Sequence, residues 1–378
     1  MSAPVALPKW ADVALIPFLN ISLAFIVSGL VVLAIGENPI TATRLMISGS
    51  LGSLNGLGYT LYYATSFIFT GLAVAVAFKA GLFNIGGEGQ AYFAGLGVAL
   101  VGLNLGFLPA FLMIPLCGLA ALLFGAAWAA IPAYLQAKRG SHIVITTIMF
   151  NSLASALMGY LLVNVLRKTG SMDPATQMFN PASYIPRLSE ILNYFGVQMA
   201  ETPVNLSLFL ALFTAWLVWV LIWRTRLGYE IRTVGANPHA AVYGGISPAR
   251  ITILTMLLSG ALTGGLAINA LMGDAHRVQL EFTAGFGFVG IAVALMGRAH
   301  PLGIVLASIL FGMLYQGGAE LAFDQPKITR DMILVIQGLV VLFGGALEGL
   351  FRAPLARFLA KFSAKDISKE SLAAKGTA

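Results

Sequence analysis

The polar side chains best placed to do chemistry lie in a glycine-rich segment, residues 79–90, which reads Lys-Ala-Gly-Leu-Phe-Asn-Ile-Gly-Gly-Glu-Gly-Gln. Glycines free the backbone from helix geometry, and non-helical backbone at membrane depth is tolerated only where it lines a cavity or is buried in protein. The candidates for a translocation path are therefore Asn84, Gly87, Glu88 and Gln90. The alternative is a tight turn at the membrane surface, in which Glu88 is hydrated and pairs with Lys79.

A second segment, residues 227–246, has the sequence of a short, capped helix between two apolar stretches. Asn237 is a good N-cap, and Pro238 suits the first helical position. Gly244 is expected to close the helix with a positive φ. The pattern predicts a helix over residues 239–243.

Two roles are open for this short helix. Its small side chains, Ala240 and Ala241, leave room for a close-packed partner, so the helix is suited to transmit force from a soluble motor subunit. The other role is that of an ordinary connection that covers the end of the bundle. The residue pattern alone favours neither.

Familiar enzyme motifs are absent from the chain. It has no Gly-x-Ser-x-Gly elbow, no His-Glu-x-x-His helix and no phosphate-binding loop. The four histidines lack metal-ligand spacing, and the single cysteine, Cys117, cannot form an internal disulfide. Asp274 and His276 are the nearest approach to an acid–base pair and are expected to lie in solvent. We therefore expect no enzyme, and no metal or cofactor bound by this chain.

The elements that must position these segments are membrane-spanning helices. Hydrophobic residues make up 58% of the 378-residue chain and charged residues 10%, whereas soluble domains carry about 25% charged residues. A spanning helix needs about 20 mostly apolar residues, and residues 48–58 are predicted to form turns. The predicted spans are residues 13–36, 62–78, two helices within 89–137, 140–166, 202–223, 251–273, 282–297, 299–319 and 332–347. The predicted fold is an all-α, polytopic membrane bundle of about ten helices.

Basic residues set the predicted orientation, because cytoplasmic loops carry an excess of Lys and Arg. With both termini inside, 15 of the 22 basic residues lie in the cytoplasm. Residues 167–205 then form an external loop and residues 224–250 a cytoplasmic loop. We expect a transmembrane domain over residues 1–351 and a cytoplasmic tail over residues 352–378. The net charge of +7 is interpreted as a topology signal, and no nucleic acid is expected as a partner.

Apart from Glu88, the acidic residues near the predicted spans fall at or beyond the ends of those spans. Ion-coupled carriers usually bury carboxylates within spans, so an external energy source or passive flow is expected instead. Any ATP hydrolysis would have to occur on another chain. A weak internal echo relates residues 71–75 to residues 290–294, each followed by a basic residue. It fits parallel repeats or chance recurrence in an apolar chain.

Three strings give the chain a resemblance to a known family. They are residues 71–90 (Gly-Leu-Ala-Val-Ala-Val-Ala-Phe-Lys-Ala-Gly-Leu-Phe-Asn-Ile-Gly-Gly-Glu-Gly-Gln), residues 234–246 (Val-Gly-Ala-Asn-Pro-His-Ala-Ala-Val-Tyr-Gly-Gly-Ile) and residues 287–297 (Gly-Phe-Val-Gly-Ile-Ala-Val-Ala-Leu-Met-Gly). The chain resembles the permease subunits of bacterial nucleoside and simple-sugar ABC importers, within the branched-chain amino-acid and ribose permease family.

The resemblance implies a complex in the bacterial inner membrane. Such permeases pair with themselves or with a homologous second permease, bind an ABC ATPase inside and receive solute from an extracytoplasmic binding protein. ATP and Mg²⁺ would be bound by the ATPase. The implied coupling residues are Glu230, Arg232, Gly235, Asn237, Pro238, Ala240, Ala241, Gly244 and Gly245. The residues that match the family's glycine-rich segment, Asn84, Gly87, Glu88 and Gln90, receive no assigned role from it.

The expected function is thus the permease subunit of an ATP-driven importer for a nucleoside-like or simple-sugar solute. The alternatives are a stand-alone facilitator or channel, which would pass solute without ATP, and an intramembrane enzyme.

Overall fold

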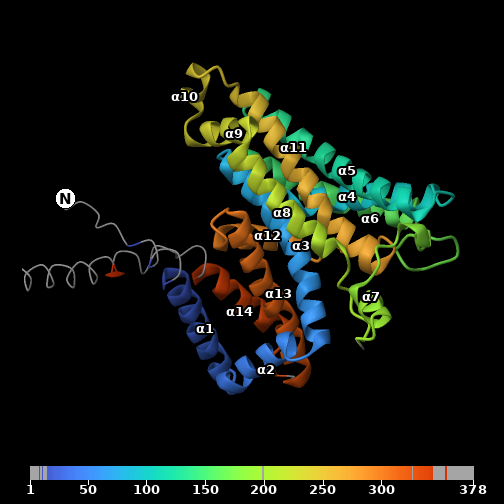
Figure 1. The fold of residues 1–378 in the computed structure, drawn as a ribbon, viewed down its shortest axis with the longest axis vertical. Helices are drawn as coiled ribbons and strands as arrows, with labels where there is room; N and C mark the ends of the chain where they lie inside the picture. The colour runs from blue at the N-terminus through green and yellow to red at the C-terminus, as the bar shows by residue number, and fades with distance from the viewer. Residues whose placement is uncertain are drawn as a thin grey trace, which may run out of the picture. The chain divides into compact units, whose positions relative to one another are not determined.

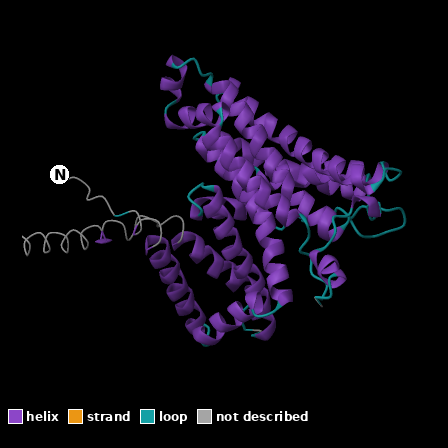
Figure 2. Ribbon diagram, in the orientation of Figure 1, coloured by secondary structure: helices purple, strands orange, loops and turns teal. Residues whose placement is uncertain are grey.

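The computed structural model describes Pro8, Ala11 and residues 15–197, 200–325, 327–343 and 354–355. Figure 2 shows helices and loops, with no strand in this part of the chain. The helices are α1 (Ile16–Ala34), α2 (Pro39–Leu51), α3 (Leu54–Lys79), α4 (Gly87–Asn104), α5 (Ala110–Arg139), α6 (Ile143–Asn164), α7 (Leu188–Tyr194), α8 (Ser207–Arg224), α9 (Arg226–Ala236), α10 (Pro238–Tyr243), α11 (Pro248–Ala267), α12 (Phe286–Met296), α13 (Pro301–Asp324) and α14 (Arg330–Val341). A π-helical turn, η3 (Ile268–Ala275), prolongs α11.

Among the described residues, six helices are long and apolar enough to cross a membrane: α3, α5, α6, α8, α11 with η3, and α13. The helices α1 and α2 meet at a bend of 118° and count as a seventh if they form one broken span. The apolar helix α12 is shorter. The all-helical prediction is confirmed, whereas the count of about ten spans is not. The expected tail, residues 352–378, lies outside the described residues except for 354–355.

The chain divides into two compact units, residues 1–43 with 322–378 and residues 44–321. In the first unit α1 contacts α14. The Lys327 ammonium group, just before α14, lies 3.1 Å from the Glu37 carboxylate, just after α1. The C-terminal end of α1 therefore lies beside the N-terminal end of α14, and the two helices are antiparallel.

The second unit is built around α3. The most apolar window of α3 is 83% buried, whereas the corresponding windows of α5, α6 and α8 are each 28% buried. Helix α3 is thus central, and α5, α6 and α8 present broad apolar faces outward. The helices α5 and α11 cross so closely that a side chain on Gly125 would lie 2.4 Å from the carbonyl oxygen of Gly260. Small residues at such crossings let membrane helices approach each other.

Helix α12 packs along α3 in parallel. The aromatic rings of Phe67 and Phe286 lie 5.1 Å apart, and Gly71, one turn further along α3, meets Val293 of α12. The two strings that echo each other in the sequence are therefore neighbours in space. Figure 1 shows α9 and α10 at one end of this unit and α7 toward the other.

The turns expected over residues 48–58 are wrong. The structure continues helix through most of this stretch, with α2 ending at Leu51 and α3 beginning at Leu54. The side chain of Ser53 accepts a hydrogen bond from the Gly56 amide at 3.0 Å and caps α3. The glycines serve close packing instead, since a side chain on Gly56 would lie 2.2 Å from the carbonyl oxygen of Gly49.

Candidate translocation and coupling sites

Glu88 lies at the meeting point of two helix N-termini. It sits in the first turn of α4, and its side chain reaches the start of α12. Carboxylate Oε1 accepts hydrogen bonds from the Thr283 hydroxyl and from the Gly285 amide (3.0 Å), while Oε2 accepts one from the Gly287 amide (2.9 Å). The positive end of each helix dipole favours a carboxylate here. Glu88 therefore clamps α4 to α12.

The alternative in which Glu88 is hydrated and pairs with Lys79 is wrong. Glu88 is only 8% exposed, so its carboxylate is not hydrated in an interfacial turn. Its carboxylate is engaged by three donors from residues 283–287 rather than by Lys79. The backbones also approach closely, since a side chain on Gly287 would lie 2.4 Å from the Glu88 amide nitrogen. Glu88 therefore lies in a closely packed junction, and its place on a translocation path stays a prediction.

Asn84 and Gln90 form a second, buried polar network. The Asn84 amide group donates to Gln90 Oε1 (3.1 Å) and to the Ser259 hydroxyl (2.8 Å), and Gln90 donates back to Asn84 Oδ1 (3.2 Å). Ser259 in turn donates to the carbonyl oxygen of Ala73 (2.7 Å). The network joins the segment before α4 to α3 and α11. Buried polar groups with such complete partners fix the packing of a core.

Asn151 on α6 completes the junction from the other side. Its side-chain oxygen accepts from the Gly89 amide (2.9 Å), and its amide group donates to the Ile85 carbonyl (2.8 Å). In the non-helical stretch 82–86, Leu82, Asn84 and Gly86 are buried and Phe83 is exposed. Burial in protein is one of the two conditions under which irregular backbone is tolerated in a membrane.

The capped helix predicted in the loop over residues 224–250 is present, as α10 (Pro238–Tyr243). The side chain of Asn237 accepts hydrogen bonds from the amides of His239 (2.9 Å) and Ala240 (3.1 Å). The positive φ expected at Gly244 is wrong, because Gly244 has φ −81° and Gly245 has φ +75°. The amides of Gly245 and Ile246 bond back to the carbonyls of Val242 and Ala241, both at 3.0 Å. In this motif the left-handed residue is the one after the cap.

The two small residues of α10 differ in exposure. Ala241 is 0% exposed and packs inward, so only Ala240 lies on the outer surface. The expectation that both leave room for a partner is therefore half right. The outer face also carries Tyr243, 95% exposed, and Val242, 59% exposed. An exposed apolar surface of this kind is typical of patches that protein partners cover.

Other predicted coupling residues hold the loop itself together. Glu230 accepts from Arg226 Nε at 3.0 Å within α9. Gly235 lies against the end of α3, where a side chain on it would sit 2.2 Å from the carbonyl oxygen of Lys79. Arg232 is exposed and its Nε donates to the Gly228 carbonyl at 3.4 Å. Gly235 therefore joins the loop over residues 224–250 to the end of α3, at the first residues of the glycine-rich segment.

Asp274 and His276 are structural residues and do not lie free in solvent as expected. The Tyr62 hydroxyl donates to Asp274 Oδ2 at 3.1 Å, and Arg187 Nη2 lies 3.8 Å from Asp274 Oδ1. The His276 ring stacks on Tyr184 with ring centres 3.7 Å apart. These contacts tie the loop over residues 167–205 to the ends of α3 and η3.

Sequence reasoning missed four residues of the junction: Asn151, Ser259, Thr283 and Gly287. Thr283 is 195 positions from Glu88, and nothing local in the sequence connects them. The string 287–297 was recognised as part of a family pattern, but its contact with Glu88 was not foreseen. No group of His, Cys, Asp and Glu residues suited to hold a metal occurs in the described part of the chain.

Comparison with known proteins gives this arrangement its class. Residues 56–344 match the family model of the branched-chain amino acid transport system permease component. The chain is 34% identical to the glucose ABC transporter permease protein TsgB13 of Haloferax volcanii, over 86% of each chain. It is 33% identical to the nucleoside ABC transporter permease protein NupB of Lactococcus lactis, over 87% of this chain and 90% of that protein. For the guanosine ABC transporter permease protein NupP of Bacillus subtilis the identity is also 33%, over 87% and 92%. No solved structure matches.

The fold and these similarities define a multi-pass membrane protein, the permease subunit of an ABC importer. The chain belongs to the family of branched-chain amino acid transport system permease components.

Proposed function

We propose that this chain forms one side of the translocation path for a nucleoside-like or simple-sugar solute, and that α10 is the contact through which an ABC ATPase drives it. The observation that carries the proposal is the capped helix α10, with an exposed face of Ala240, Val242 and Tyr243 at the end of α9, which packs on α3 through Gly235. Force applied to α10 is thereby passed to the helix that leads into the Glu88 junction.

The proposed solute class rests on the relatives, which are named for transport of glucose, nucleosides and guanosine. The proposed partners are the ABC ATPase, which would bind ATP and Mg²⁺, an extracytoplasmic solute-binding protein and a second permease. For the second permease we favour a homologue over a second copy of this chain. The nucleoside ABC transporter permease protein NupC, from the same organism as NupB, is 32% identical to this chain over 67% of its length.

The proposed topology has ten spans in the bacterial plasma membrane, with both termini in the cytoplasm. The spans are α1, α3, α4, α5, α6, α8, α11, α12, α13 and α14. Two groups of contacts support it. Glu37 pairs with Lys327 and Asp274 with Arg187, all four on the predicted outside. Lys79 contacts Trp223 and Gly235, which the same topology places on the cytoplasmic side.

The decisive experiment replaces Ala240, because it is exposed, rather than Ala241, whose replacement would disturb packing. In the assembled complex, A240W should abolish uptake and solute-stimulated ATPase activity while expression, membrane insertion and melting temperature stay unchanged. The matched control is M172W on the external loop, where Met172 is 94% exposed. The M172W variant should keep ATPase binding. Wild-type uptake by A240W would overturn the proposal.

A further inference from the structure

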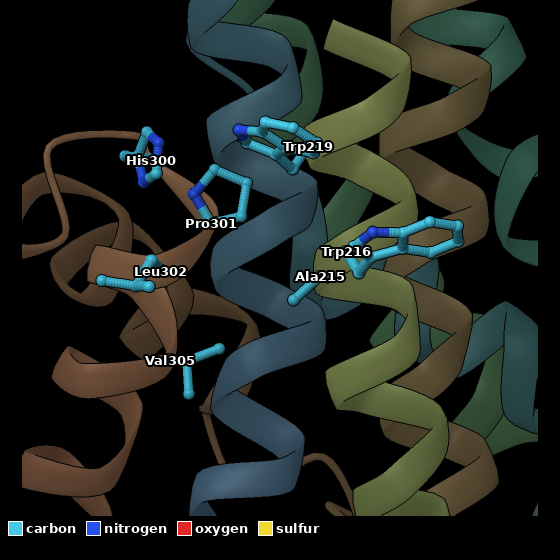
Figure 3. A pocket seen from close by; sticks show the side chains of 7 residues that line it. All are labelled: Ala215, Trp216, Trp219, His300, Pro301, Leu302 and Val305. Carbon is cyan, nitrogen blue, oxygen red and sulfur yellow. The ribbon is translucent and has the colours of Figure 1, made fainter. Parts of the chain in front are cut away.

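A cavity of about 340 Å³ opens between α8 and the first turn of α13. Its lining consists of Ala215, Trp216, Trp219, His300, Pro301, Leu302 and Val305 (Figure 3). The wall is almost entirely carbon, so it offers a sugar or a nucleoside very few hydrogen-bond partners. Sites for polar solutes need a few well-placed polar groups, and this cavity suits an apolar chain instead.

One rim of the cavity is cationic and aromatic. Arg224 Cζ lies 5.2 Å from the centre of the Trp219 ring, which lines the cavity. Lys79 Nζ lies 5.4 Å from the centre of the Trp223 ring, and that ring is 5.2 Å from the lining residue His300. Arg224 is therefore joined to the cavity through one aromatic ring, Trp219, and Lys79 through two, Trp223 and His300. The face of an aromatic ring attracts a cation.

The surroundings of this rim add positive charge. Lys79 lies close enough to Arg232, and His300 to Lys79, for their charges to interact. Among the residues that the structure describes, neither Lys79 nor Arg224 forms an ion pair with a carboxylate. Burial and the charge of Lys79 both lower the pKa of His300. The rim thus carries unbalanced cations that an anion can neutralise.

The position of the site matches the edge of a bilayer. Three of the five tryptophans of the chain, Trp216, Trp219 and Trp223, follow one another along the last two turns of α8. Tryptophans gather at the level of the lipid headgroups, and basic residues between membrane helices attract anionic lipids. Arg224 ends α8, so the charged rim lies at the membrane surface and the carbon-lined cavity lies below it.

We propose that this cavity holds an acyl chain of an anionic phospholipid from the cytoplasmic leaflet, whose headgroup phosphate lies at Lys79 and Arg224. The choice of leaflet rests on the proposed orientation, whereas the lipid site itself does not. The bound lipid would fill the space between α8 and α13 at the end of the bundle where α3 meets the cytoplasmic loop.

The test is native mass spectrometry of the full chain, purified within its complex, with phosphatidylglycerol or phosphatidylcholine added at equal concentration. The wild type should retain one more phosphatidylglycerol than phosphatidylcholine. The charge variant K79Q/R224Q should lose that lipid, and R167Q/K168Q, in which two exposed external cations are removed, should keep it.

A second pair of variants tests the cavity rather than the charge. A215F, which fills it, should also lose the retained phosphatidylglycerol, while T214F should keep it. Thr214 lines a different pocket on α8 and serves as the matched control. W219L provides the same test if A215F fails to assemble, because it removes the ring between Arg224 and the cavity.

Equal retention of the two lipids by the wild type would overturn the proposal, as would unchanged retention by K79Q/R224Q. A lipid retained by the isolated chain but lost in the assembled complex would also overturn it, since a protein partner would then cover the site. These readouts do not depend on uptake, so they separate the lipid site from the proposed coupling role of α10.

Discussion

At the scale of single residues, Glu88 shows how a carboxylate is accommodated in the buried interior of a membrane protein. Its carboxylate is satisfied by one hydroxyl and two backbone amides at the start of α12, and it lies in the first turn of α4. A buried charge is costly unless it is paired or fully hydrogen-bonded. The role that follows is to hold two helices together.

We expect E88Q to destabilise the protein by about 1–3 kcal/mol, because the new side-chain amide brings a donor against backbone donors. The measurement is thermal unfolding of the detergent-purified complex. The control is E201Q, whose carboxylate is 89% exposed and 3.9 Å from Arg187, a surface pair of little energetic value. If E88Q kept its melting temperature but lost uptake, Glu88 would be a path residue and not a clamp.

At the scale of elements, the loop over residues 224–250 is joined to the helical bundle by backbone contact. Helix α9 packs its last turn on the end of α3 at Gly235, where no side chain fits. Helix α10 then follows at a capped corner. A rigid corner resting on a central helix transmits displacement better than a flexible loop would.

G235A should push α9 away from α3 and destabilise the loop by about 1–3 kcal/mol, the usual range for overpacking. Uptake should fall together with the stability of the loop, because the displaced loop would hold α10 in the wrong position. The matched control lies in the same loop: G244A adds a methyl group only 3.4 Å from the Ala241 carbonyl, an ordinary contact. Melting curves and uptake are measured on both, and equal behaviour of the two variants would contradict the packing argument.

The elements that sequence predicted well are those specified by neighbouring residues. The Asn237 cap and the Pro238 start of α10 are local features, and the structure has both. The one-residue error at Gly244 arose because two adjacent glycines are equivalent in sequence, whereas hydrogen-bond geometry selects the second.

Long-range contacts were not accessible in this way. The partners of Glu88 and Asn84 come from residues 283–287 and 259, and a single sequence does not pair such distant positions. The glycines at 49 and 56 were taken for turn signals because sequence alone does not show which helices they pack between.

At the scale of the molecule, the contacts of the second unit fall at two ends. Asp274 with Arg187 and His276 with Tyr184 hold the loop around α7. Lys79, Trp223 and Gly235 hold the loop around α10. A transporter that is driven from one side of the membrane and receives its solute from the other needs two such separate surfaces.

Single-cysteine labelling tests this orientation in a C117S background, since Cys117 is buried and is the chain's one cysteine. Y243C should react with a membrane-impermeant maleimide only when the cytoplasmic face is accessible, as in inverted vesicles. Y194C, at a position 87% exposed on α7, should react only from outside. Labelling of both from the same side would refute the topology.

The Glu88 carboxylate also has a consequence for cargo. The N-terminus of a helix binds anions favourably. At the start of α12, backbone amides donate hydrogen bonds to Glu88. The Glu88 carboxylate already occupies this helix N-terminus, and its negative charge offsets the positive end of the helix dipole. The phosphate group of a phosphorylated sugar or a nucleotide would therefore gain no electrostatic attraction at this helix N-terminus.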